Sequence, residues 1–256
     1  MFIIGINDNH DASACLIKDG VIVDLIQEER LRRKKNLGSF PKESLRYIIK
    51  NNKINSKNID HVCVANIKLA HMNFWNVASD FKTSDWYKLQ EKFHYEKIFN
   101  KKRVKLRDIF PNYKPSIKLS YSLKGIPFVS SDDASKKSHE YIMERRIKTI
   151  SNFLKIDKKK ISFYDHHDCH AFYGFYSSPN THRGKVTAVV TADGGGDGLY
   201  NSVSCFKNGK FKSISRSKNN WIAKIYESVT LLLGMNPFRH CFKVMGLAPH
   251  SNIKRH

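Results

Sequence analysis

The sequence predicts an α/β fold in which one structural unit occurs twice. Short apolar segments typical of buried strands alternate with segments in which apolar residues recur at helical spacing. The order strand, polar loop, strand, tight turn, strand occurs over residues 2–26 and again over residues 186–214. We therefore expect an internal duplication whose two polar loops face one cleft.

The first unit is expected to begin with three strands, at residues 2–7, 12–17 and 21–26. Asp19 and Gly20 separate the last two strands, and such a pair is typical of a tight hairpin because glycine accepts a positive φ. A charged loop is expected over 27–36. Pro41 then begins a helix that reaches Asn51, and a fourth strand follows at 59–65.

The middle of the chain is expected to hold an insertion followed by a long helix. Residues 66–128 mix tryptophan and other aromatic residues with lysines. These aromatics could stack on nucleobases, but such residues more often anchor an insertion to its domain. A core-facing helix is expected over 138–154, a short strand over 161–164, and another helix from His166 to Tyr176.

The second unit is expected to repeat the opening pattern. Strands are predicted at 186–192, 200–206 and 210–214, with a polar loop at 193–198 and an Asn-Gly turn at 208–209. A helix over 221–233 should end at Gly234. Residues 242–249 then lead to a tail, 251–256, that has no fold signal.

Composition limits the function classes. The 256 residues carry a formal net charge of +22, yet the lysines are spread along the whole chain. We therefore expect this charge to serve general solvation or anionic substrates rather than nucleic acid. No segment resembles a membrane span or a signal peptide, and the five cysteines include no C-x-x-C pair. We expect a cytoplasmic protein without a disulfide framework.

A metal site is the first candidate for chemistry. On a helix, His166 and His170 would project from one face, a geometry that suits two ligands of one ion. Asp193 follows a predicted buried strand and could supply a third ligand. Among twelve histidines, however, this spacing also occurs in ordinary surface or core histidines.

Anion-binding groups are the second candidate. His10 follows the first strand and could be a general base, a phosphate contact or only a turn histidine. Arg30, Lys34 and Lys35 belong to a cluster just past the third strand that could bind phosphate or carboxylate. Backbone N–H groups of the glycine run could hold phosphates; this run comprises Gly194, Gly195 and Gly196.

Taken together, the motifs resemble the amino-terminal region of the O-carbamoyltransferases of the nodulation and antibiotic-tailoring family. The matching stretches occur in family order: GINDNHDAS at 5–13, QEER at 27–30, RKK at 33–35, FP at 40–41, DHHDCHA at 165–171, DG at 193–194 and KVMGLAP at 243–249. Each stretch alone is weak evidence, but their combination is specific.

The resemblance implies an actin/Hsp70/sugar-kinase-like fold of two ribonuclease-H-like lobes and a reaction in two steps. Carbamoyl phosphate and ATP would give a carbamoyl adenylate, and an acceptor hydroxyl, such as that of a sugar, would then take the carbamoyl group. It also implies that His166, His170 and Asp193 bind a metal, with iron(II) favoured over zinc and manganese. His10 would lie near the transfer chemistry and Lys35 near carbamoyl phosphate.

The resemblance also sets the expected domain boundaries. We expect a first lobe at 1–184 that carries the insertion, and at 185–256 the start of a second lobe. Family members continue well past the KVMGLAP motif, so we expect a truncated product or one piece of a split protein, with a separate chain supplying the missing lobe. The chain alone is not expected to carry out the transfer. Two alternatives remain: a relative of tRNA threonylcarbamoyl transferases, and a non-catalytic binding fragment.

Overall fold

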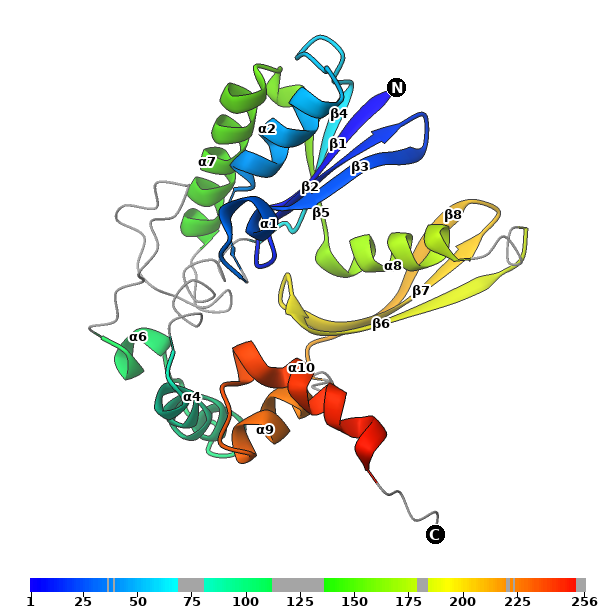
Figure 1. Cartoon of the computed structure of the whole chain (residues 1–256). Coiled ribbons are helices and arrows are strands. Elements are labelled where there is room, and N and C mark those ends of the chain that lie inside the picture. The colour runs from blue at the N-terminus through cyan, green and yellow to red at the C-terminus, as the bar shows by residue number, and fades with distance from the viewer. Residues whose placement is uncertain are drawn as a thin grey trace.

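Two β-sheets with a helix between them form the body of the molecule. The structure, a computed structural model, describes residues 1–35, 37–38, 40–68, 81–111, 136–178, 184–219, 222 and 224–251 (Figure 1). Strands and helices alternate along the chain, which confirms the α/β class. None of the described helices is long and apolar enough to cross a membrane.

The first sheet has five strands in the order β3-β2-β1-β4-β5. β1 pairs antiparallel with β2, and β2 pairs antiparallel with β3, while β1, β4 and β5 are parallel. Asp19 and Gly20 make the expected tight turn, with φ of 50° and 84°. The strands are β1 (Phe2–Asn7), β2 (Ser13–Lys18), β3 (Val21–Gln27), β4 (His61–Ala65) and β5 (Ile161–Tyr164).

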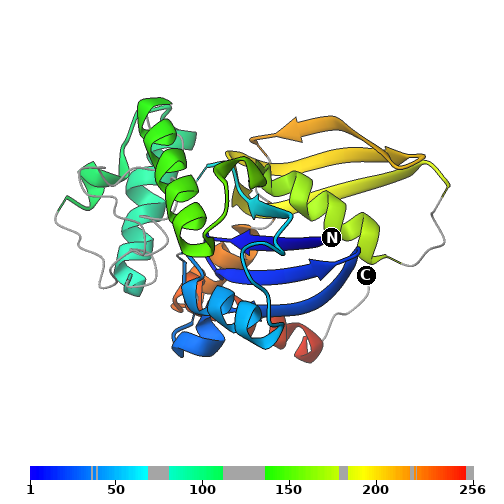
Figure 2. The same cartoon turned by 90° about the horizontal axis from the view of Figure 1, so that it is seen from above.

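Two helices, α2 (Lys42–Asn51) and α7 (Lys136–Leu154), cover one face of this sheet (Figure 2). Their apolar residues share one core with the strands, because the helical and strand periodicities both present apolar side chains to the same layer. This core includes Ile4, Ile6, Leu16, Leu45, Ile48, Val62, Val64, Ile150 and Leu154.

A short helix, α1 (Glu28–Arg32), replaces part of the charged loop expected at 27–36. Its first residue, Glu28, is buried, and its carboxylate accepts hydrogen bonds from the backbone N–H groups of Glu43 and Ser44. The Ser44 hydroxyl donates a third bond to Glu28. Since the first N–H groups of a helix lack partners within the helix, Glu28 caps α2.

The second sheet is an antiparallel meander of β6 (Thr187–Gly196), β7 (Leu199–Lys207) and β8 (Lys210–Ser217). The sequence analysis ended the first of these strands at Ala192 and was wrong there, since β6 continues to Gly196. Only Asp197 and Gly198 form the turn, with φ of 52° and 84°. Asp197-Gly198 is the same dipeptide as Asp19-Gly20, for which the tight turn was predicted correctly.

Helix α8 (His166–Ser177) lies between the two sheets (Figure 1). The rings of Phe172 and Phe175 contact Phe206 of β7, with centroids 5.2 and 4.1 Å away. At the other end of α8, Arg216 of β8 bonds the carboxylates of Asp165 and Asp168 at 3.0 and 2.6 Å. The second sheet is therefore attached to both ends of α8.

The described part of the insertion forms a separate aromatic core with helices from the end of the chain. Its elements are α4 (Thr83–Leu89), the π-helix η1 (Gln90–Tyr95), α5 (Glu96–Ile98) and α6 (Leu106–Ile109). Trp86 and Phe93 share a cluster with Leu231, against which Phe238 packs. The aromatics thus act as anchors, but toward the chain's later helices rather than the first sheet. Residues 69–80, with Trp75, and 112–135 lie outside the described residues.

Those later helices are α9 (Lys224–Leu232) and α10 (Pro237–Leu247), the second of which the sequence analysis missed. The start of α10 has a typical helix N-terminus in its sequence, an asparagine cap followed by proline. Asn236 accepts hydrogen bonds from the N–H groups of Phe238 and Arg239, and Pro237 lies in the first turn. Two short 3-10 helices, η2 (Lys158–Lys160) and η4 (Ala248–His250), complete the described elements.

Candidate metal centre

His166 and His170 lie on the first turns of α8, directly after β5. Asp165 begins this helix, because its carboxylate accepts hydrogen bonds from the N–H groups of His167 and Asp168 at 2.9 and 3.1 Å. The spacing of four residues then places the two imidazoles one turn apart on one face, with ring centroids 4.5 Å apart. α8 therefore forms where the sequence predicted a helix, and it places His166 and His170 side by side as expected.

Asp193 reaches these histidines from an irregular part of β6. Pairing of β6 with β7 shifts between Ala192, which faces Asn201, and Gly196, which faces Leu199. Three residues of β6 therefore oppose the single Tyr200 of β7. Bulges of this kind change the direction in which a side chain points, and they are common beside active sites. The Gly194 N–H donates to Oδ1 of Asp193 at 2.6 Å, which leaves Oδ2 facing α8.

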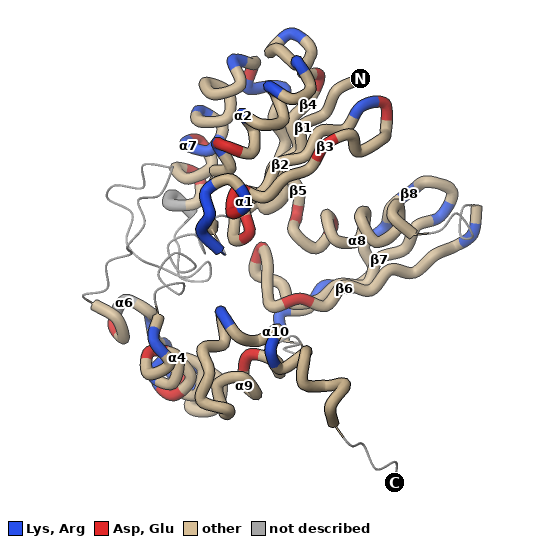
Figure 3. The backbone as a smooth tube through the Cα atoms, viewed as in Figure 1, with Lys and Arg blue, Asp and Glu red and all other residues tan. Residues whose placement is uncertain are grey.

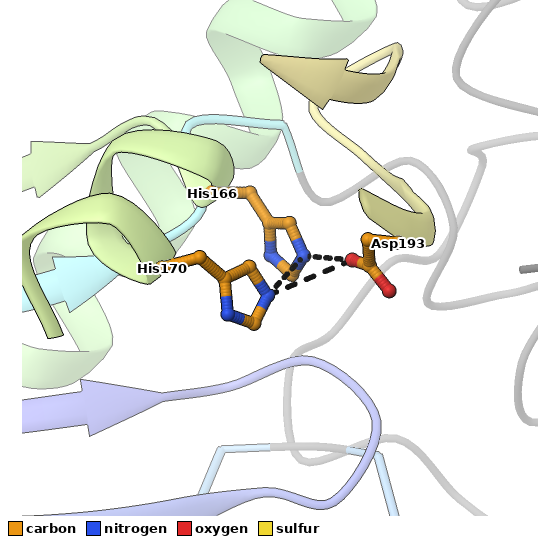
Figure 4. A group of neighbouring side chains, drawn as sticks. All are labelled: His166, His170 and Asp193. Carbon is orange, nitrogen blue, oxygen red and sulfur yellow. Dashed lines mark hydrogen bonds and ion pairs between the residues drawn. The ribbon is translucent and has the colours of Figure 1, made fainter. Parts of the chain in front are cut away.

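The three side chains converge on one point (Figure 4). Nε2 of His170 lies 3.0 Å from Nε2 of His166 and 3.6 Å from Oδ2 of Asp193. Nε2 of His166 contacts the same carboxylate oxygen directly. Among the described residues this is the one such group, with all three donor atoms within 4.8 Å of one another. We call His166, His170 and Asp193 the histidine centre.

The charge of the centre follows from these contacts. Burial alone would raise the pKa of the Asp193 carboxyl, but hydrogen bonds with His166 and His170 outweigh it and hold that pKa well below its ordinary value. The bond to Asp193 raises the pKa of His170, against the opposite effect of desolvation. The carboxylate is therefore anionic at neutral pH and offers a negative charge to a cation.

The donor set fits a divalent transition metal. Atoms bound to one ion at about 2.1 Å lie roughly 3.0 to 3.4 Å apart. The separations of Nε2 of His170 from its two partners, 3.0 and 3.6 Å, are near this range, while His166 and Asp193 lie closer together than that. Two imidazoles and a carboxylate suit iron(II), zinc or manganese. Cys169 lies between the histidines in sequence but offers no thiolate, because burial and the nearby carboxylates of Asp165 and Asp197 raise its pKa to about 12.

His166 is fixed on several sides. Its ring nitrogen Nδ1 lies 2.9 Å from Oδ1 of Asn66, and its backbone N–H donates to Asp197 at 2.8 Å. The ring lies against Gly196, where an added Cβ would be only 2.1 Å from Cδ2 of His166. No residue with a side chain fits at position 196 unless His166 moves.

The other two predicted phosphate-binding glycines also have structural roles. Gly195 adopts a φ of +127°, a value that side chains disfavour, and thereby forms the bulge. Gly194 holds the Asp193 carboxylate. Phosphate binding by these N–H groups stays a prediction, and the bulge explains the glycines without it.

His10 lies in the loop after β1 and pairs with its neighbour. Its Nδ1 is 2.9 Å from the Asp11 carboxylate, and about a third of its side chain is exposed. This hydrogen bond lowers the pKa of Asp11 against the effect of desolvation. The structure thus places His10 beside a carboxylate that can orient its ring, while its catalytic role stays a prediction.

The predicted anion-binding residues lie on a projecting part of the first unit. Arg30 is on α1, and Lys34 and Lys35 follow it; all three are exposed. We call residues 30–35 the basic segment (Figure 3). Directly after it, the carbonyl of Leu37 accepts a bond from the Ala12 N–H at 2.9 Å, and Gly38 lies against the backbone of His10. The segment therefore ends next to the His10 loop.

Sequence reasoning missed the residues that support His166. Arg146 and Asp8 form a fully buried, bidentate ion pair in which both hydrogen bonds are 2.8 Å long. Arg146 also donates to the carbonyls of Asn66 and Ile67 at 2.8 and 3.0 Å. Asp197 accepts bonds from the N–H groups of residues 67 and 68 at 3.0 and 2.6 Å. Asp8 and Asn66 each come directly after a strand of the parallel part of the sheet. Because α/β proteins place functional groups at these strand ends, the sequence could have identified both residues as candidates.

Comparison with known protein families finds a match over nearly the whole chain. Residues 2–256 match the family described as the carbamoyltransferase N-terminus. An uncharacterized protein of Synechocystis is 23% identical over 96% of this chain and 34% of its own length. One of Methanocaldococcus jannaschii is 25% identical over 97% and 33%. Nodulation protein NolNO of Sinorhizobium fredii is 23% identical over 96% and 28%.

The chain thus spans about a third of the length of these relatives. The match nevertheless includes both sheets, the histidine centre and the later helices, so it does not depend on any single motif. On that evidence, and as the resemblance predicted, the chain belongs to the carbamoyltransferase N-terminus family.

Proposed function

We propose that this chain is the amino-terminal part of an ATP-dependent O-carbamoyltransferase. In this reaction carbamoyl phosphate and ATP give a carbamoyl adenylate, from which an acceptor hydroxyl, such as that of a sugar, takes the carbamoyl group. The family match over residues 2–256 carries this proposal. The convergence of His166, His170 and Asp193 supports it, because the resemblance to these transferases implies a metal bound by the same three residues.

We also propose the duplicated, actin/Hsp70-like arrangement of two ribonuclease-H-like lobes. In support, β1-β2-β3 and β6-β7-β8 are both antiparallel meanders whose last two strands join at a tight turn. The residue pairs in those turns are Asp19-Gly20 and Asn208-Gly209, and all four residues have positive φ. The shared order and turn chemistry favour an origin by duplication.

In this proposal the histidine centre holds a divalent metal, iron(II) first among the candidates. When bound, such an ion would polarise and orient phosphate or carbonyl oxygens. The chain's own contribution is geometric. Asp197 and Gly196 fix the position of His166, and the bulge in β6 directs Asp193 toward α8. A rigid ligand set of this kind needs no rearrangement when the reactants bind.

The basic segment would bind carbamoyl phosphate. It follows β3, and β3 runs in the same direction as β1 because both pair antiparallel with β2. The His10 loop, the basic segment and the start of α8 therefore lie at one edge of the sheet, where α/β proteins place ligands. Lys35 would hold the phosphate and His10 would be near the transfer chemistry. ATP phosphates would be bound by the backbone of Gly194, Gly195 and Gly196.

Calorimetry with the full 256-residue chain, a divalent metal ion and carbamoyl phosphate tests this proposal. We expect Lys35→Ala to weaken binding about 10-fold, since it removes a charge-assisted contact to phosphate. Lys57→Ala is the matched control, because Lys57 is an exposed lysine in the loop before β4, at the opposite edge. Absence of binding by the wild type, or equal losses in both variants, would contradict the proposal. Inorganic phosphate in a parallel titration shows whether the carbamoyl group is recognised.

A further inference from the structure

A chain of side-chain amides links the His10 loop to the histidine centre. Nδ2 of Asn7 donates to the carbonyl oxygens of His10 and Asp11 at 3.0 and 3.3 Å. This fixes the orientation of the Asn7 amide, so its Oδ1 is the acceptor on the other side. That oxygen accepts from the N–H of Asn9 at 3.1 Å and from Nδ2 of Asn66 at 3.3 Å.

The orientation of Asn7 determines that of Asn66. Because Nδ2 of Asn66 donates to Asn7, its Oδ1 faces His166, 2.9 Å from Nδ1. An amide oxygen only accepts hydrogen bonds, so Nδ1 of His166 must carry the hydrogen. With a metal ion in place of the hydrogen that Nε2 shares with Asp193, the lone pair of Nε2 would point at that ion, next to the Asp193 carboxylate and the second histidine.

The backbone of Asn66 is held in a conformation that is costly for a residue with a side chain. Its φ is 103°, and the residue is almost fully buried. Its N–H donates to the carbonyl of Tyr164 at 2.9 Å, while its own carbonyl accepts from Arg146 at 2.8 Å. Backbone strain of this kind persists only where surrounding contacts hold the residue in place, and it is common at functional sites.

We propose that Asn66, oriented by Asn7, is a positioning residue that fixes the His166 tautomer so that Nε2 is available to a divalent transition-metal ion. The inference rests on the metal centre of the proposed function and adds a residue that binds no metal itself. Partners of this type, which hold the second nitrogen of a ligand imidazole, commonly contribute to metal affinity.

Zinc titration of the full chain against a chromogenic chelator tests the role of Asn66. Asn66→Gly removes the acceptor but tolerates the positive φ, and we expect it to weaken zinc binding about 10- to 100-fold. Asn66→Asp keeps an acceptor oxygen for Nδ1 and should stay within about threefold of wild type. Asn208→Gly is the matched control, because it replaces an asparagine that also has positive φ, in the turn before β8.

Nitrogen-15 NMR of the zinc-loaded protein gives a readout that a purely structural role would not change. We expect the wild-type His166 ring to be protonated at Nδ1 and zinc-bound at Nε2, and Asn66→Gly to lose this single state. Unchanged zinc affinity and an unchanged His166 tautomer in Asn66→Gly would overturn the inference and leave the metal centre intact. A wild type that binds no zinc would instead overturn the metal centre, and with it this inference.

Discussion

The histidine centre and the basic segment differ in how firmly the structure holds them. His166 is bonded through its backbone N–H and both ring nitrogens, and its side chain is only 16% exposed. In the basic segment, the Arg30 side chain is 68% exposed and its ion pair with Glu29 spans 3.6 Å. A metal requires ligands in fixed directions, whereas a phosphate can be bound by long side chains that close around it. The difference therefore matches the two proposed roles.

The largest expected effect comes from the buried ion pair behind the histidine centre. Arg146→Ala removes both Arg146 bonds to the buried Asp8 carboxylate and the donor to the Asn66 carbonyl. We expect the free energy of unfolding to fall by about 3 to 5 kcal/mol. Urea denaturation followed by circular dichroism measures this change. Arg145→Ala, one residue earlier on α7, removes a bond to Tyr141 and should cost less than about 1 kcal/mol. Similar losses in both variants would show that the ion pair has no special role.

Gly196→Ala tests whether the centre tolerates any displacement. The new Cβ would lie 2.1 Å from Cδ2 of His166, so the ring or β6 must move. We expect a loss of about 1 to 3 kcal/mol in stability from overpacking, together with weaker metal binding. Gly209→Ala is the control, because its Cβ meets nothing within 4 Å and only its φ of +72° is unfavourable. That variant should lose about 1 kcal/mol and keep its metal affinity. Normal metal binding by Gly196→Ala would disprove the close fit.

His170→Ala affects the ligand set rather than the fold. His170 is half exposed, so stability should change little, but one of the three proposed ligands is lost. We expect metal affinity to fall by about 10-fold or more. Elemental analysis after dialysis measures the retained metal, with His250→Ala as the control for an exposed histidine. Equal metal content in both variants and the wild type would exclude the centre as a binding site.

The smallest effect is expected in the basic segment. Lys34→Ala should leave the free energy of unfolding unchanged within about 0.5 kcal/mol, because the side chain is exposed. Its contribution to carbamoyl phosphate binding should decrease as salt rises, since exposed charges are screened. Calorimetry at two salt concentrations checks this. A stability loss as large as that of Gly196→Ala would show that the basic segment is part of the fixed framework.

The sequence by itself predicted the periodic elements and the local pair of histidines. Alternation in the strands and the Asp19-Gly20 turn depend only on neighbouring residues, as does the helix that brings His166 and His170 together. The family could likewise be inferred from motifs along the chain, and the match over residues 2–256 confirmed it.

Tertiary structure decided what supports those residues. The Asp8–Arg146 pair spans 138 positions and the Asn66–His166 contact spans 100, and no local pattern encodes such partners. The bulge in β6 was read as a loop because its glycines resemble loop residues, whereas its shape follows from pairing with β7 and from contact with the His166 ring. Local spacing thus predicted the candidate ligand residues, and long-range packing fixed their geometry, because only the folded chain brings the supporting groups into contact.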